Sequence, residues 1–95
     1  MANYVTNSLS RILLKTDLDW TAALTKQVTI FKPDGTHIHY IGDDVVVVDA
    51  PLGVVYVDFT PTIEGEHLVQ AFRALSADDR RHSEFQDFYV SEPIA

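Results

Sequence analysis

The chain has 95 residues, no cysteine and a formal net charge of −7, from 14 acidic and 7 basic residues. One domain fits this length, and the shortage of Lys and Arg argues against nucleic acid or an anionic membrane surface as a partner. The absence of cysteine excludes disulfides, thiolate nucleophiles and iron–sulfur clusters. We therefore expect one domain that works in the cytosol or in a virus particle assembled there.

Both ends of the chain lack a clear pattern. Residues 1–8 show no apolar alternation, which predicts an extended N-terminal arm, with a first strand through residues 4–6 as the alternative. Residues 92–95 are predicted to be a short tail. The domain is therefore assigned to residues 9–91.

Residues that favour strands dominate the rest, since Val, Ile and Thr account for 25 of the 95 residues. Residues 19–26 have the spacing of one or two helical turns or of a loop with a turn. Turn residues such as Pro33-Asp34-Gly35, and the segments 50–53 and 76–80, separate short apolar runs. The seven predicted strands are 9–15, 27–32, 37–41, 44–49, 54–60, 66–74 and 84–91. This spacing predicts an all-β sandwich or a small barrel.

Four segments, in this order, form a recognisable sequence pattern: Val-Thr-Ile-Phe-Lys-Pro-Asp-Gly at 28–35, Gly-Val-Val-Tyr-Val-Asp-Phe at 53–59, Glu-Gly-Glu-His-Leu-Val-Gln-Ala at 64–71 and Phe-Tyr-Val at 88–90. They resemble immunoglobulin-like β-sandwich modules, in particular the small domains found among virion proteins of tailed bacteriophages. The resemblance covers residues 10–91. It implies an immunoglobulin-like β-sandwich of about seven strands.

The sequence departs from that pattern at two positions. His67 stands where such modules usually have the tyrosine of a tyrosine corner. Trp20 lies before the second predicted strand, so the usual core tryptophan has no counterpart, and the usual disulfide has none either. The tyrosine-corner hydrogen bond is therefore not expected in its usual form.

The histidines raise two hypotheses. His37 and His39 lie on one face of a predicted strand and could bind a metal with Asp43 or Asp44, or they could simply flank Ile38 on an exposed face. His67 shares the parity of apolar neighbours and is expected to face the core. It is then either a buried histidine with its hydrogen bonds satisfied or a pH switch.

No catalytic motif is present: the chain has no G-x-S-x-G elbow and no glycine-rich phosphate loop. The carboxylates are dispersed over predicted loop tips and strand ends, which suits solvated charge better than an acid–base pair or a calcium loop. We therefore expect neither an enzyme nor a cofactor or metal.

The chain carries more apolar residues than one sandwich interior holds, since several predicted strands are apolar on both faces. Val28, Ile30, Phe59, Val69, Ala71, Phe88 and Val90 are predicted for the core. The second apolar face is either an interface or is covered internally by the segment around Tyr4, Leu9 and Trp20. The predicted interface residues are Tyr4, Val5, Tyr56, Leu68, Phe72, Phe85 and Tyr89.

The resemblance implies a structural virion protein of a tailed bacteriophage: a capsid decoration, neck or tail component. Its partners would be other virion proteins and copies of itself, held by adhesion in a symmetric assembly. The alternative is a carbohydrate- or receptor-binding module of a fibre or a host-surface protein, for which Trp20, Tyr40 and Tyr56 are the candidate aromatics.

Overall fold

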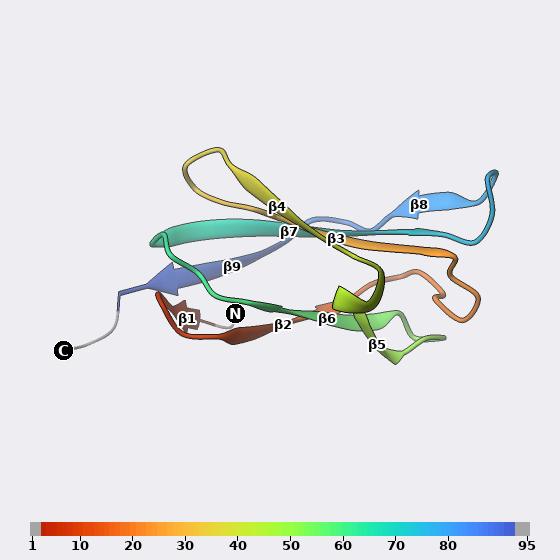
Figure 1. Cartoon of the computed structure of the whole chain (residues 1–95), viewed down its shortest axis with the longest axis horizontal. Helices are drawn as coiled ribbons and strands as arrows, with labels where there is room; N and C mark the ends of the chain where they lie inside the picture. The colour runs from red at the N-terminus through yellow and green to blue at the C-terminus, as the bar shows by residue number, and fades with distance from the viewer. Residues whose placement is uncertain (1–2, 93–95) are drawn as a thin grey trace.

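The computed structural model describes residues 3–92 and shows an all-β sandwich of two sheets (Figure 1). The strands are β1 (Asn3–Val5), β2 (Ser10–Lys15), β3 (Thr25–Phe31), β4 (His37–Ile41), β5 (Val46–Asp49), β6 (Val54–Phe59), β7 (Gly65–Ala74), β8 (Arg80–His82) and β9 (Gln86–Ser91). The one helical element among the described residues is a single 3₁₀ turn, η1 (Gly42–Asp44), between β4 and β5.

The larger sheet has the strand order β1-β9-β7-β3-β4, with β8 also pairing with β7, and the smaller sheet has the order β2-β6-β5. In Figure 1 the small sheet lies below the large one. The chain crosses between them repeatedly, because β2 is in the small sheet, β3 and β4 in the large one, β5 and β6 in the small one, and β7 to β9 in the large one. These crossings give the immunoglobulin-like order of a sandwich.

The core lies between the sheets and consists of alternate residues from the facing strands. All seven residues predicted for the core are buried in it, and they come from β3, β6, β7 and β9. Ile12 and Leu14 of β2 and Val55 and Val57 of β6 close the core from the small sheet. The period of two along these strands explains why the prediction was correct, since every second side chain points to the same face.

One end of the core is closed by a loop. Trp20 is buried, and its Nε1 donates a hydrogen bond to Thr16 Oγ1 at 2.9 Å. Thr16 Oγ1 donates in turn to the carbonyl oxygen of Gly53 at 2.8 Å. Gly53 has φ +74°, and a Cβ there would meet the carbonyl oxygens of Thr16 and Leu18. The loop after β2 and the β5–β6 turn therefore fit together only with glycine at this point.

The seven predicted strands all form, with shifts of up to two residues at their ends. The segment 19–26 is a loop with a turn that leads into β3, not a helix. Residues 50–53 connect β5 and β6 as an antiparallel hairpin, as predicted.

The structure adds two strands. Residues 3–5 form β1, which pairs in parallel with β9, so the strand alternative holds for this part of the N-terminal segment rather than a free arm. β8 pairs with the last three residues of β7, whereas β9 pairs with its first five. Residues 1–2 of the expected arm and 93–95 of the expected tail lie outside the described residues.

Candidate interaction surface

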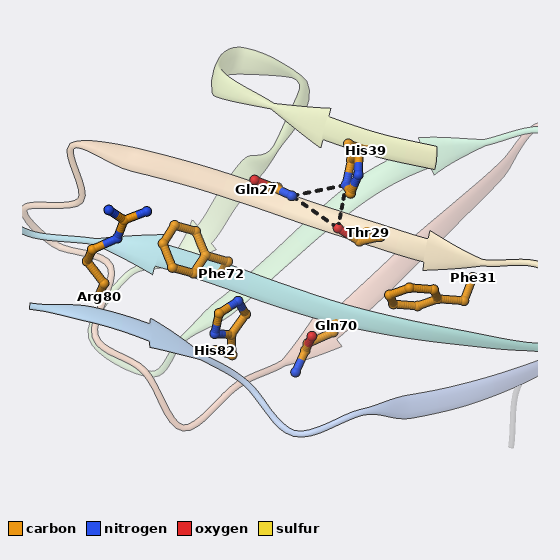
Figure 2. Close-up of a pocket in the computed structure, with 8 residues that line it drawn as sticks. All are labelled: Gln27, Thr29, Phe31, His39, Gln70, Phe72, Arg80 and His82. Atoms are coloured by element: carbon orange, nitrogen blue, oxygen red, sulfur yellow. Dashed lines mark hydrogen bonds between the residues drawn. The ribbon is translucent and has the colours of Figure 1, made fainter. Parts of the chain in front are cut away.

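A shallow groove lies on the solvent side of the large sheet, where β3, β4, β7 and β8 present alternate side chains (Figure 2). Its volume is about 330 Å³. We call it the outer groove, and its lining residues are Gln27, Thr29, Phe31, His39, Gln70, Phe72, Arg80 and His82. They have the parity opposite to that of the core residues on the same strands, so the sheet separates the outer groove from the core.

Phe72 forms the centre of one half of the outer groove. The Arg80 guanidinium lies 5.4 Å from the Phe72 ring centroid, and the His82 ring centroid lies 4.7 Å from it (Figure 2). The pairing of β8 with β7 causes this arrangement, because Phe72 is opposite His82 and Arg80 is one step along the same face. A cation over a ring face is a favourable but weak contact at an exposed site.

The other half of the outer groove is a small hydrogen-bond cluster across β3 and β4. Thr29 Oγ1 lies 2.7 Å from His39 Nδ1, and Gln27 Nε2 donates to both of these atoms at 3.2 and 3.0 Å (Figure 2). Because Gln27 Nε2 can only donate, His39 Nδ1 accepts, and the ring proton of neutral His39 is on Nε2. The cluster fixes three polar side chains on the open face of the sheet.

An aromatic chain continues from the groove across the same face. The Phe31 and Phe85 ring centroids lie 5.8 Å apart, the Phe31 and His37 centroids 6.0 Å, and the His37 and His39 centroids 4.7 Å. Phe85 is 55% exposed. This face therefore combines aromatic surface with hydrogen-bond donors.

The charges of the outer groove differ from those of the whole chain. None of the carboxylates in residues 3–92 lines it, although the chain has 14 acidic residues. Among residues 3–92 the ion pairs are Arg11–Asp58, Arg73–Asp79 and Arg81–Asp79. In this part of the chain Arg80 makes no ion pair, so the groove is locally cationic.

The seven predicted interface residues do not form one surface. Leu68, Phe72, Phe85 and Tyr89 share the outer face of the large sheet. Val5 lies at the edge of the same face, because it pairs with Ser91, which has the parity of Tyr89. Tyr4 faces the core from β1, and Tyr56 belongs to the small sheet.

Tyr4 packs against the core, with its ring 5.4 Å from that of Phe88, whereas its neighbour Val5 is exposed on the edge strand β1. Tyr56 lies on the outer face of the small sheet, with the Arg11 guanidinium 3.9 Å from its ring centroid. Tyr4 and Tyr56 therefore lie apart from the residues on the outer face of the large sheet. The alternative of internal cover by Tyr4, Leu9 and Trp20 does not hold for that face, because Tyr4 and Trp20 pack on the core between the sheets and Leu9 is exposed.

The suggested metal ligands lie on opposite sides of the sheet edge formed by β4 and the turn that follows it. His37 and His39 point to the outer face, whereas the following Tyr40 points inward and lines a separate hollow with Asp43 and Asp44. Within residues 3–92, no group of three His, Asp or Glu side chains could hold a metal ion. The His-His-Asp combination is therefore not brought together.

His67 is buried between aromatic rings, as its parity predicted. Its ring stacks on Phe88 at 5.1 Å and meets Phe59 edge-on at 5.8 Å. Nδ1 donates to the carbonyl oxygen of Gly65 at 3.1 Å, and Nε2 has no hydrogen-bond partner among the described residues. Burial lowers the pKa of His67 below its usual 6.5, and the Gly65 bond offsets this in part. Burial at this position thus favours the neutral form of the imidazole.

The aromatic residues of the carbohydrate-binding alternative are not gathered. Trp20 is buried, Tyr40 packs against the core from β4, and Tyr56 lies on the small sheet. These three residues therefore do not form the single aromatic patch that carbohydrate binding would need.

Sequence reasoning singled out His39 and Phe72 and missed the other six residues of the outer groove: Gln27, Thr29, Phe31, Gln70, Arg80 and His82. Gln27 and Gln70 carry no signal in the sequence beyond their parity on predicted strands. Arg80 ends the predicted turn segment 76–80 and His82 follows it, and the strand that holds both exists only through its pairing with β7.

No family model, no curated protein and no solved structure matches this chain. Across residues 3–92, no helix has the length and apolar character needed to cross a membrane.

Proposed function

We propose that this protein is a structural adhesion module, a virion protein of a tailed bacteriophage that binds copies of itself and other virion proteins in a symmetric assembly. The observation that carries the proposal is the apolar surface left open on the large sheet. Leu68 is 41% exposed, Phe85 55% and Tyr89 41%, and all three lie on one face. The resemblance of residues 10–91 to small immunoglobulin-like virion domains supplies the setting.

The energetics favour an interface on this face. Fully burying one large apolar side chain is worth about 1.5–3 kcal/mol, and covering the exposed 41–55% of Leu68, Phe85 and Tyr89 recovers part of this for each residue and favours association. The molecule measures 48 × 25 × 21 Å. A face of 48 by 25 Å therefore has a larger area than the roughly 800 Å² that each partner buries in a standard interface. The proposal assigns no catalytic role to the chain.

Sedimentation velocity of the wild-type chain across the micromolar range tests self-association. We expect a concentration-dependent oligomer, and we expect Leu68→Ser/Phe85→Ser to remain a monomer with a thermal midpoint close to that of the wild type. Leu13→Ser/Leu52→Ser is the matched control, because both leucines are exposed but Leu13 lies on the small sheet and Leu52 in the β5–β6 turn. A wild-type chain that stays monomeric at every concentration would contradict the proposal.

The virion assignment has its own test. Mass spectrometry of purified phage particles from the source should find the chain in a copy number that matches a symmetric ring or shell. Particles that lack the chain altogether would rule out this role while leaving the adhesion surface intact.

A further inference from the structure

We propose that copies of this chain associate head to tail, with the acidic η1 turn of one copy docked in the outer groove of the next. This inference rests on the proposed function, because it names the partner and the contact for the same sheet face. It is carried by two surfaces of opposite charge on opposite faces of the molecule.

The first surface is the outer groove. It contains the Arg80 cation and the Nε2–H of His39, and none of the described carboxylates lines it. The amide of Gln27 donates within the groove cluster, and that of Gln70 donates to the carbonyl oxygen of Ser83 at 3.0 Å. A ligand for this groove should therefore bring acceptor oxygens and negative charge. A carboxylate is the matching group, because hydrogen bonds between charged partners are about twice as strong as neutral ones.

The second surface surrounds η1. Asp43 and Asp44 are both exposed on this turn, and with Asp58, Tyr40 and Val46 they line a hollow of about 310 Å³. Asp58 has Arg11 as a partner, but no ion pair among residues 3–92 includes Asp43 or Asp44. The turn therefore presents two carboxylates without a counter-charge in the described part of the chain.

Strand β4 separates the two surfaces. His39 points into the outer groove, and the next residue, Tyr40, points into the acidic hollow, so the surfaces face opposite sides of the same strand. They cannot meet within one molecule. Between molecules they form a heterologous contact, which closes into a ring or continues as a filament. Both forms suit a symmetric assembly.

Charge also argues against the other self-contact. A twofold contact of two outer grooves would bring two Arg80 guanidinium groups together with no carboxylate from the described groove lining between them. In the head-to-tail contact each Arg80 meets two aspartates. The second copy is therefore the occupant that the charge pattern favours.

Charge reversal tests the contact in sedimentation velocity. Because a charge-assisted contact is replaced by repulsion, we expect Arg80→Glu and Asp43→Lys/Asp44→Lys each to weaken self-association about tenfold or more. Mixing these two variants should restore a complex, because the groove of the Arg80→Glu variant is then acidic and meets the lysines of the other variant. Higher salt should weaken the wild-type oligomer and the restored complex alike.

Two control variants make the same change in net charge at positions outside the proposed contact. Lys15→Glu is the control for Arg80→Glu, and Asp17→Lys/Glu64→Lys is the control for the double aspartate variant, since these residues lie outside both surfaces. We expect both controls to associate like the wild type, and all variants to keep its thermal midpoint.

The outcomes separate this inference from the proposed function. A wild-type oligomer that Arg80→Glu and the double variant leave unchanged, or a mixture that does not reassociate, overturns the head-to-tail contact and leaves adhesion standing. Equal weakening by the controls overturns it as well. A wild-type monomer overturns both.

Discussion

The two faces of strands β3 and β7 differ in what their side chains touch. On the inner face Val28, Ile30, Val69 and Ala71 are buried against the small sheet. On the outer face the same strands carry Gln27, Phe31, Gln70 and Phe72 around an open groove. The inner face is complete within one molecule, whereas the outer face holds a cation and aromatic surface that the described chain does not cover. We therefore expect stability to depend on the first face and, under the proposed function, recognition to depend on the second.

The largest effect on stability is expected for a substitution of Trp20, which closes one end of the core. Trp20→Ala should lower the free energy of unfolding by about 3–5 kcal/mol, because it opens a cavity and leaves Thr16 Oγ1 without its indole donor. Urea unfolding measures this change. Leu52→Ala, at an exposed position in the neighbouring loop, should change stability by less than about 0.5 kcal/mol. A loss below about 1 kcal/mol for Trp20→Ala would show that the loop does not close the core.

A second, pH-dependent effect is expected at His67. The pKa of His67 is lowered in the folded state, so below pH 6.5 the unfolded chain binds a proton more readily than the folded chain. The stability that neutral His67 contributes is complete above pH 6.5 and is lost as the pH falls toward the folded-state pKa. His67→Phe should keep the fold and flatten this slope.

Thermal unfolding between about pH 8 and pH 5 measures the His67 slope. His37→Phe is the control, because His37 is exposed on the outer face, and it should retain the wild-type slope. An unchanged slope in His67→Phe would assign the pH dependence to other groups and remove His67 from the account.

The smallest effect on stability is expected on the outer face. Phe72→Ser should cost about 1 kcal/mol or less, because the ring is only partly buried and contacts mainly Arg80 and His82. The same change should weaken self-association, which separates recognition from stability on one strand. A stability loss as large as that of Trp20→Ala, or association equal to the wild type, would contradict the division between the two faces.

Much of the candidate surface could be read from period-two patterns. Leu68 and Phe72 share one parity on their strand and Phe85 and Tyr89 share one on theirs, so their common exposure follows from the pleat. Parity says which residues of one strand share a face but not which sheet the strand joins, and Tyr56 lies on the small sheet for this reason. Tyr4 faces the core because of the register in which β1 pairs with β9. Arg80 could not be placed at all before its pairing with β7 was known.

By itself, the sequence determined the elements that depend on neighbouring residues: the alternating strands, the hairpin at 50–53, the buried positions Val28, Ile30 and Val69, and the inward direction of His67. Only the tertiary structure decided the contacts between distant segments. β1, near the start of the chain, pairs with β9, near its end. The hydroxyl of Thr16 forms hydrogen bonds with both Gly53 and Trp20. Local geometry repeats every two residues and is visible in the sequence, whereas pairing across a sheet depends on which surfaces are brought together when the chain folds.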